Sequence, residues 1–266
     1  HILGIGGTFM AGIAIIAKQL GHQVTGSDKN LYDPMKSVLE KENIIFTEGY
    51  NPKTLDKKFD LVIVGNVMSR GMNIIEKLLE SDIKYISGPQ WLYENVLYKK
   101  KVIAISGTHG KTTTSSIVTW ILKYAKLNPS YLIGGQPINL NSPAKLTSSK
   151  FFIIEADEYD TSFFDKRSKY IHYHPDILVI NNIEFDHADI FENIDAVVKN
   201  FHHLVRIVPK SGKIIYNHDD KNINELIKKG IWSKEISLTA KNSKSANWSL
   251  SKKENNFFLS NMKTKA

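Results

Sequence analysis

Short apolar runs alternate with segments of helical spacing along the first hundred residues. Five apolar runs predict strands, and they span Ile2–Gly4, Gln23–Gly26, Ile44–Phe46, Leu61–Val64 and Lys84–Ile86. Between them, apolar residues recur every three or four positions in three segments that predict helices, Met10–Leu20, Pro34–Glu42 and Ile74–Ser81. An alternation of strands and helices favours a parallel sheet with covering helices.

A second series of strands begins after the lysines at 99–101. The strand-like runs are Val102–Ile105, Tyr131–Ile133, Phe151–Ile154, Ile177–Ile180 and Lys213–Tyr216. Continuous apolar runs of this kind suit strands that are buried on both faces. We therefore place a domain boundary near Tyr98 and predict two α/β domains, residues 1–98 and residues 99–266. Beyond Gly230 the texture changes to Asn, Ser and Lys with isolated β-like runs, which indicates a domain edge or a truncated unit.

The segment 106–114 (SGTHGKTTT) carries the strongest chemical signal of the chain. It follows the apolar run Val102–Ile105 and precedes the helical segment Ser115–Leu122. A strand, a glycine loop, a Lys-Thr pair and a helix form a phosphate cradle, because backbone N–H groups and the helix N-terminus attract phosphate oxygens. The match to the usual Walker pattern is incomplete, since Ile105 stands where the first glycine falls. The competing interpretation is a glycine-rich turn with a surface lysine.

We expect this loop to bind the β- and γ-phosphates of a nucleotide. In such a loop, Lys111 reaches these phosphates and Thr112 holds Mg²⁺. The residues assigned to this nucleotide are Gly107, Thr108, His109, Gly110, Lys111, Thr112 and Thr113.

An earlier glycine-rich loop, Gly4–Gly12, follows the first predicted strand and opens a helix. Its backbone can approach a diphosphate. Asp28 closes the second strand about 20 residues further on, where a dinucleotide fold places its ribose-binding acid. Phe9 occupies the position of the third glycine of G-x-G-x-x-G, which argues against a nicotinamide dinucleotide. We expect another nucleotide here, with a nicotinamide cofactor and a purely structural turn as the alternatives.

Carboxylates follow two of the buried strands. Residues 155–158 (EADE) end one strand, and residues 181–187 (NNIEFDH) end the next. Ligands of open α/β sheets bind at this edge, and oxygen ligands beside a phosphate loop favour Mg²⁺-assisted phosphoryl transfer. Glu155 is the best Mg²⁺ ligand, and His187 is a candidate contact to a second metal or a phosphate. The alternative is a pair of ordinary charged loops.

A charge run at 165–167 (DKR) has two interpretations. It is either a solvated turn or an anion clamp for a carboxylate or phosphate.

Composition and charge exclude several function classes. The net charge is +8, but 12 lysines and 5 acidic residues after Val208 account for +7 of it, and that region has no arginine. A dispersed lysine excess is a poor base-reading surface, so we expect no nucleic-acid partner. No apolar run approaches the roughly 18 residues of a membrane span, so we expect no membrane insertion. The absence of cysteine excludes a disulfide framework and fits a cytoplasmic location.

Together these motifs resemble those of the Mur ligases, the ATP-dependent amide-forming enzymes of bacterial cell-wall synthesis. The resemblance covers nearly the whole chain and rests on Gly4–Gly12, Ser27-Asp28, Gly107–Thr113, Glu155–Glu158 and Asn182–His187. Four further segments are similar to the branch of this family that recycles murein peptides: Gly7–Met10, Glu155–Asp160, Phe163–Lys169 and Glu184–Phe191. Tyr159 and Ala188 favour this branch over the related L-alanine ligases.

The resemblance implies a fold and a chemistry. The N-terminal domain is then Rossmann-like and holds a UDP-sugar, with Gly6, Gly7 and Thr8 at the diphosphate and Ser27 and Asp28 at the nucleotide sugar. The central domain is then a P-loop ATPase-type α/β domain that binds ATP and Mg²⁺.

The family's reaction assigns roles to the central-domain residues. Its enzymes phosphorylate the lactyl carboxylate of UDP-N-acetylmuramate, and an amine then attacks the acyl phosphate. Lys111, Glu155 and His187 are the implied catalytic residues, and Thr112, Glu155 and His187 the implied metal ligands. The implied amine substrate is the murein tripeptide L-Ala-γ-D-Glu-meso-diaminopimelate.

The resemblance also implies a third, C-terminal domain, which this chain is too short to include. We therefore expect the chain to be part of a longer protein and to be inactive alone. Two other functions compete with the recycling ligase. One is a UDP-N-acetylmuramate–L-alanine ligase, and the other is a nucleotide-sugar binding module without catalysis.

Overall fold

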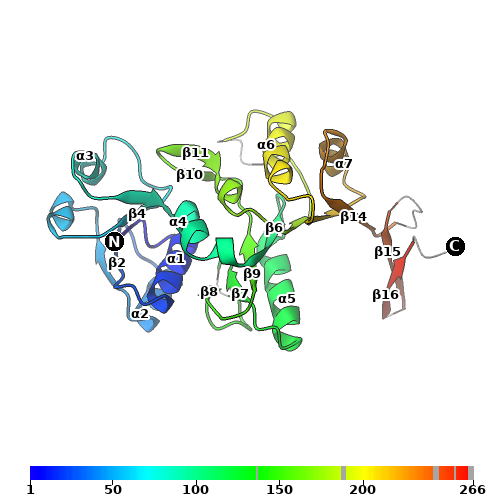
Figure 1. Cartoon of the computed structure of the whole chain (residues 1–266), viewed down its shortest axis with the longest axis horizontal. Helices are drawn as coiled ribbons and strands as arrows, with labels where there is room; N and C mark the ends of the chain where they lie inside the picture. Colours follow the sequence, from blue (N-terminus) through cyan, green and yellow to red (C-terminus); the bar gives the residue numbers. More distant parts are fainter. Residues whose placement is uncertain (136, 187–189, 242–245, 255, 263–266) are drawn as a thin grey trace.

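The computed structural model describes residues 1–135, 137–186, 190–241, 246–254 and 256–262. A parallel sheet and a mostly parallel sheet, each with covering helices, lie end to end along the long axis of the molecule (Figure 1). The predicted α/β fold is therefore confirmed. Among the described residues, no helix combines the length and the apolar character that a membrane crossing requires.

The first sheet contains five parallel strands in the order β3-β2-β1-β4-β5. The strands are β1 (Ile2–Leu3), β2 (Thr25–Asp28), β3 (Ile45–Glu48), β4 (Val62–Val64) and β5 (Tyr85–Ser87). Its helices are α1 (Thr8–Gln19), α2 (Met35–Lys41), α3 (Asn73–Leu79) and α4 (Gly88–Asn95), with a 3₁₀ turn at Pro52–Asp56. The order reverses on either side of β1, so the loop after β1 lies at the switch point where such sheets bind ligands.

The predicted strand at Gln23–Gly26 is shifted by two residues in the structure. β2 begins at Thr25 because Gly26 pairs with Ile2 and Ser27 with Leu3. Gln23 lies on the surface instead.

The second sheet has nine strands in the order β16-β15-β14-β13-β12-β6-β9-β7-β8. Its core strands are β6 (Lys101–Ser106), β7 (Ser130–Leu132), β9 (Phe151–Glu155), β12 (Ile177–Ile180), β13 (Lys213–Asn217) and β14 (Lys234–Thr239). These strands run parallel, whereas β8 (Ala144–Lys145) and the pair β15 (Trp248–Lys253) and β16 (Asn256–Asn261) introduce antiparallel edges. Figure 1 shows the β15–β16 hairpin at the end of the sheet beyond β14, so the region beyond Gly230 extends the sheet.

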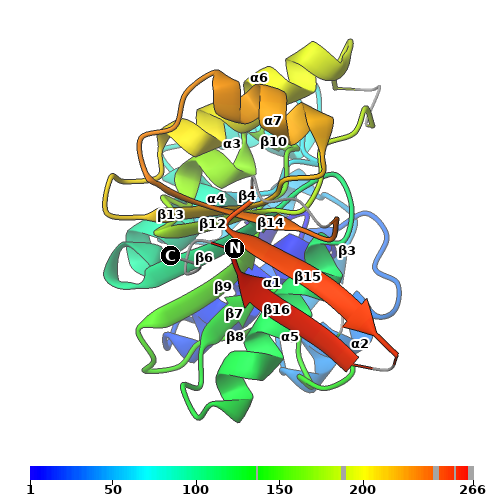
Figure 2. The ribbon, with the colours of Figure 1, turned by 90° about the vertical axis from the view of Figure 1, so that its right-hand side faces the viewer.

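Helices cover both faces of the second sheet. α5 (Lys111–Tyr124) lies on one face, and α6 (Ile194–Arg206) and α7 (Lys221–Lys228) lie on the other (Figures 1 and 2). Strand β9 leads into a small hairpin of β10 (Asp160–Ser162) and β11 (Asp165–Ser168). Short 3₁₀ turns occur at Leu97–Lys99 and Lys169–His172.

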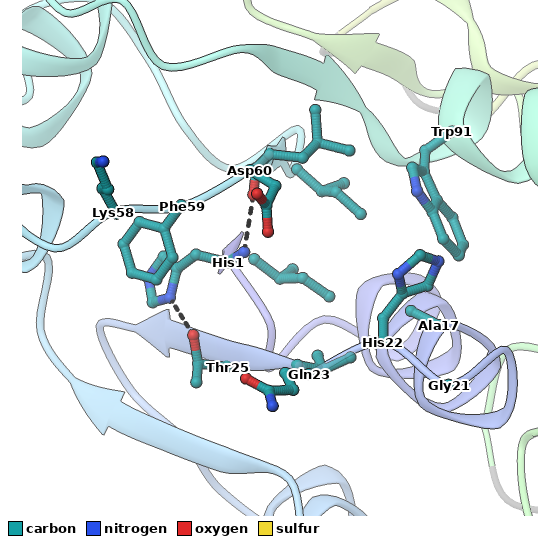
Figure 3. A pocket seen from close by; sticks show the side chains of 14 residues that line it. His1, Ala17, Gly21, His22, Gln23, Thr25, Lys58, Phe59, Asp60 and Trp91 are labelled. Atoms are coloured by element: carbon teal, nitrogen blue, oxygen red, sulfur yellow. Dashed lines mark hydrogen bonds between the residues drawn. The ribbon is translucent and has the colours of Figure 1, made fainter.

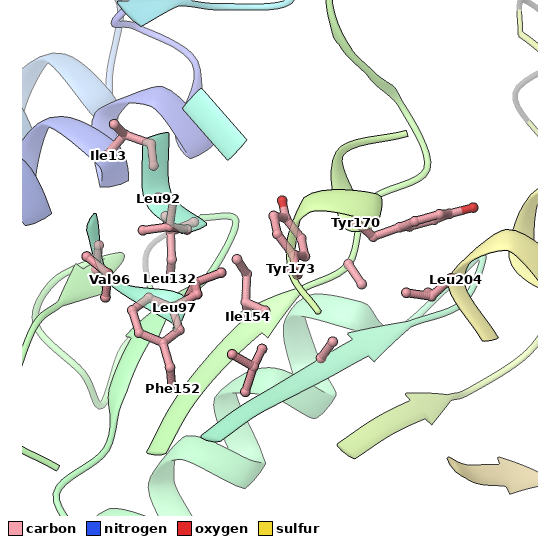
Figure 4. Close-up of a cluster of buried hydrophobic side chains, with 14 of the residues drawn as sticks. Ile13, Leu92, Val96, Leu97, Leu132, Phe152, Ile154, Tyr170, Tyr173 and Leu204 are labelled. Atoms are coloured by element: carbon pink, nitrogen blue, oxygen red, sulfur yellow. The ribbon is translucent and has the colours of Figure 1, made fainter. Parts of the chain in front are cut away.

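One apolar core runs from the first sheet into the second. Side chains of α1 and α4, such as Ile13 and Leu92, are fully buried together with Leu132, Phe152 and Ile154 of the second sheet (Figure 4). The contact is close because α1 presents a glycine to the second sheet. A Cβ at Gly12 would lie 3.0 Å from Leu132 Cγ and 3.4 Å from Ala144 Cβ.

Candidate functional site

The first glycine loop joins β1 to α1 and is supported from β2. The backbone N–H groups of Gly4 and Ile5 donate to the carbonyl of Ser27 at 2.9 and 3.3 Å. The N–H of Gly6 donates to Asp28 Oδ2 at 2.8 Å. Gly7, which follows, is exposed at the mouth of the loop. The loop is therefore held in place by β2, and its outer part faces solvent.

The five residues assigned to the sugar nucleotide lie at different depths. Gly7 and Thr8 are exposed, and Gly6 and Asp28 are partly exposed. Ser27 is fully buried, and its hydroxyl lies 3.2 Å from His1 Nε2. Ser27 thus supports the loop from below, and Asp28 is the side chain of this pair that reaches the edge of the sheet.

The second glycine loop connects β6 to α5 and requires glycine at its start. Gly107 has φ +132°, and a Cβ there would lie 3.1 Å from Asn181 Cβ and from the backbone of Asn182. Gly110 has φ +78° and forms the N-cap of α5. The first N–H groups of an α-helix have no partner within the helix, so this N-terminus can receive an anion.

The end of β12 clamps this second loop. Thr108 N–H donates to the carbonyl of Asn182 at 3.1 Å, and His109 N–H donates to Asn182 Oδ1 at 2.7 Å. Thr108 Oγ1 accepts from the N–H of Glu184 at 2.9 Å, and Asn181 Nδ2 donates to Thr114 Oγ1 at 3.0 Å. The loop is thus pre-organised before any ligand arrives.

Lys111 and Thr112 lie against the carboxylates that follow β9. Lys111 Nζ is 3.2 Å from Glu158 Oε2 and donates to the carbonyl of Gly107 at 2.8 Å. Thr112 Oγ1 donates to Glu155 Oε2 at 3.2 Å. The other carboxylate oxygen of Glu155 accepts from Gly134 N–H at 2.9 Å. The structure therefore brings together the predicted lysine, threonine and glutamate.

Burial raises the pKa of both Glu155 and Glu158. It raises the pKa of Glu155 to about 7, although the Thr112 hydroxyl and the Gly134 N–H oppose the shift. Burial also raises the pKa of Glu158, and Lys111 opposes that shift. A divalent cation beside Glu155 would favour the ionised form and would meet a carboxylate and a hydroxyl, the hard oxygen ligands that Mg²⁺ takes. The residues at this edge therefore fit Mg²⁺.

His187, the third predicted metal ligand, lies outside the described residues. The described residues just before it continue the clamp, because Glu184 is bonded to Thr108. His109 Nε2 lies 3.8 Å from a carboxylate oxygen of Glu184.

Three contributions were missed by the sequence reasoning. It did not assign the ion pair between Lys111 and Glu158, the clamp by Asn182, or the contact of Gly134 with Glu155. The Asn-Asn pair at the end of a strand beside the phosphate loop was a usable signal for the second of these. The other two depend on which strands are neighbours in space.

The charge run at 165–167 forms a locally closed pair. Arg167 donates to Asp165 through Nε at 2.9 Å and through Nη2 at 2.7 Å. These hydrogen bonds hold the pKa of Asp165 at about 2. Asp165 also contacts His172 Nε2 at 3.0 Å. The guanidinium of Arg167 is therefore engaged by Asp165 within the turn, which favours the turn over an anion clamp.

A pocket of about 470 Å³ lies at the opposite edge of the first sheet (Figure 3). His1, Thr25 and Leu61 line it at the amino ends of the strands, with His22 and Trp91 on its other side. Because both glycine loops lie at the carboxyl ends of strands, this pocket is separate from the candidate site.

Comparisons with known proteins agree with this geometry. Residues 1–100 match the family model described as "Mur ligase family, catalytic domain", and residues 105–266 match "Mur ligase middle domain". The UDP-N-acetylmuramate--L-alanyl-gamma-D-glutamyl-meso-2,6-diaminoheptandioate ligase of Escherichia coli K12 is 54% identical over 235 residues, which are 88% of this chain and 51% of that protein. The UDP-N-acetylmuramate--L-alanine ligase of Clostridium novyi is 35% identical, over 86% of this chain and 48% of its own length.

A solved structure is similar over nearly the whole chain. It is the UDP-N-acetylmuramate:L-alanyl-gamma-D-glutamyl-meso-diaminopimelate ligase of Neisseria meningitides, with a TM-score of 0.92 and 44% identity, covering 98% of this chain and 83% of that one. The chain spans about half the length of the curated relatives it matches. The two family matches, the relatives and the two loops lead to one conclusion: the chain belongs to the Mur ligase family.

Proposed function

We propose that this chain supplies the nucleotide-binding part of an ATP-dependent amide ligase of peptidoglycan recycling. The whole protein would join L-Ala-γ-D-Glu-meso-diaminopimelate to UDP-N-acetylmuramate. The observation that carries the proposal is the 54% identity, over 88% of this chain, to a ligase named for this reaction. We place the reaction in the cytoplasm, where ATP and UDP-sugars are available.

We assign the sugar nucleotide to residues 1–98 and ATP to residues 99–266. The backbone of Gly6, Gly7 and Thr8 would bind the diphosphate, because this loop opens a helix at the switch point of its sheet. Asp28 would hold the loop through Gly6 and approach the ribose or the uracil from β2.

The second loop would bind the phosphates of ATP. Its backbone from Gly107 to Thr113 and the N-terminus of α5 form the cradle, and Lys111 would move from Glu158 to the β- and γ-phosphates. Thr112 and Glu155, together with His187, would hold Mg²⁺, which would supply positive charge against the phosphates when bound. Asn182 keeps the loop in place during this exchange.

The proposed reaction has two steps. An oxygen of the lactyl carboxylate attacks the γ-phosphorus of ATP, the bond to the β,γ-bridging oxygen breaks, and ADP leaves with that bond's electron pair. The tripeptide's amine then attacks the acyl carbon, loses a proton and expels inorganic phosphate. Lys111 would stabilise the negative charge that develops on the phosphates in the first step. Binding of the distant UDP group would orient the carboxylate.

The test is phosphate release by the complete protein with Mg-ATP and UDP-N-acetylmuramate, in the presence of either the tripeptide or L-alanine. We expect phosphate release when the amine is the tripeptide and none when it is L-alanine. Release with L-alanine alone would move the protein to the biosynthetic L-alanine step, and no release with either amine would favour a nucleotide-sugar binding module. Lys111→Ala is the matched control, because it should abolish release while binding of the UDP-sugar persists.

A further inference from the structure

Lys169 places a buried cation between the two glycine loops. The residue follows β11 and is 8% exposed. Its ammonium lies 2.9 Å from Asp157 Oδ2, 5.9 Å from the ring centre of Phe9 and 5.7 Å from that of Tyr159. Phe9 follows Thr8 in the first turn of α1, and Asp157 lies two residues after Glu155. The ammonium therefore stands between the sugar-nucleotide loop and the carboxylates of the ATP site.

The position of this cation is fixed by the backbone as well as by its side chain. Lys169 N–H donates to the carbonyl of Tyr159 at 3.0 Å, and the two aromatic rings flank the amine. An ammonium has three N–H donors, and within the described residues Asp157 is its one hydrogen-bond partner. A buried amine among aromatic rings therefore keeps donors that a ligand can use.

The Lys169–Asp157 ion pair joins a buried cation to a much more exposed carboxylate, which is a poor arrangement if the pair serves stability alone. The side chain of Asp157 is 32% exposed, whereas that of Lys169 is 9% exposed. Water already solvates much of Asp157, so Asp157 needs no buried cation, whereas burying the Lys169 ammonium costs solvation. The arrangement makes more sense when a second anion comes to the same ammonium.

The proposed reaction supplies such an anion. A sugar carboxylate that came to this place would be repelled by Asp157, and the Lys169 ammonium beside Asp157 would offset that repulsion. Lys111 is already engaged by Glu158 and by the carbonyl of Gly107. Lys169 is the lysine that lies beside Phe9 of the first loop's helix.

We propose that Lys169 binds the lactyl carboxylate of the sugar nucleotide, sharing its ammonium between that carboxylate and Asp157. This proposal rests on the function proposed above. It assigns to Lys169 the selection of a sugar nucleotide that carries a carboxylate over one that lacks it.

The test compares two ligands that differ only in the lactyl ether that carries the carboxylate. Calorimetric titration of the complete protein with UDP-N-acetylmuramate and with UDP-N-acetylglucosamine gives the ratio of the two affinities. We expect the wild type to prefer UDP-N-acetylmuramate and Lys169→Met to lose about tenfold of that preference, the effect of one charge-assisted hydrogen bond. Lys169→Arg should retain part of the preference. Lys166→Met is the control, because Lys166 lies in β11, three residues before Lys169, with a 71% exposed side chain paired to Asp160.

The double variant Asp157→Asn/Lys169→Met distinguishes a structural role of Lys169 from a role in ligand selection. It removes the unpaired carboxylate that the single variant leaves, so it should restore stability without restoring the ligand preference. A folded Lys169→Met protein that keeps the full preference would overturn the assignment, and so would a wild type that binds both ligands equally. A wild type that binds neither sugar nucleotide would overturn the proposed function, and the assignment with it.

Discussion

Replacing Lys111 with Met should lower the free energy of unfolding, because it leaves the buried carboxylate of Glu158 without this lysine. The Glu158 side chain is 2% exposed, and Lys111 Nζ lies 3.2 Å from it. Removing one partner of a buried ion pair destabilises a protein by about 3–5 kcal/mol, whereas Met preserves most of the packing of the lysine stem. Lys111 is 15% exposed and Glu158 can take up a proton, so we expect a loss of about 3 kcal/mol at pH 7.

The pH dependence gives this prediction its sign. Burial raises the pKa of Glu158, and the variant removes the lysine that opposes this rise. A carboxyl group whose folded pKa lies above its unfolded pKa contributes stability below the unfolded pKa, and that contribution is lost as pH rises through the folded pKa. The deficit of Lys111→Met should therefore be small near pH 5 and largest near pH 8.

Urea unfolding at several pH values, followed by circular dichroism, measures these differences. Glu158→Gln alone should cost about 1 kcal/mol, because Lys111 keeps the carbonyls of Gly107 and Thr108 as acceptors. The double variant Lys111→Met/Glu158→Gln should match Glu158→Gln and lose the pH dependence. If the double variant is as unstable as Lys111→Met at every pH, then the Glu158 charge left without Lys111 is not the cause and the reasoning fails.

Three further predictions use other parts of the site. Burial raises the pKa of Glu155 to about 7, so without divalent cations the free energy of unfolding should fall by about 3 kcal/mol as pH rises from about 4.5 through 7. Glu155→Gln or added Mg²⁺ should flatten the dependence of the urea midpoint on pH. An unchanged slope in the Glu155→Gln variant would show that Glu155 is not the cause. Gly12→Leu should lower the melting temperature by several degrees in calorimetry, since a Cβ there already lies 3.0 Å from Leu132. Gly7→Ala should have little effect, because its Cβ would make only an ordinary contact of 3.7 Å with the carbonyl oxygen of Gly4. Asp28→Ala should weaken UDP-sugar binding in a calorimetric titration by about tenfold through loss of the acceptor for Gly6 N–H, and unchanged affinity would remove Asp28 from the site.

Local pattern predicted much of the fold, and its omissions have a physical explanation. The continuous apolar runs at 102–105, 151–154 and 177–180 became neighbouring strands because a sheet covered on both faces requires them. Helix α6 was not assigned, although Asn193 caps it and Val197, Phe201 and Leu204 line its buried face. That spacing was visible in the sequence. By contrast, the short strands β8 and β10 have no sufficient apolar signal, and only their partners define them.

The site was predictable where its chemistry is local. The loop residues from 107 to 113 come from one stretch of sequence, whereas Lys111 and Glu158 are 47 residues apart. Their contact exists because β6 lies between β9 and β12, so that the loop after β6 is enclosed by the ends of both neighbours. The clamp by Asn182 has the same origin. Strand order is a property of the whole sheet, and sequence spacing does not reveal it.

The core shared by the two sheets has a consequence for how the molecule loses its structure. Ile13 and Leu92 from one half and Phe152 from the other are buried in a single cluster. Neither half can melt without uncovering apolar surface of the other, so heating should produce one calorimetric transition with a van't Hoff enthalpy close to the measured enthalpy. For the same reason, either half expressed by itself would expose the apolar surface that the other half covers, and should self-associate.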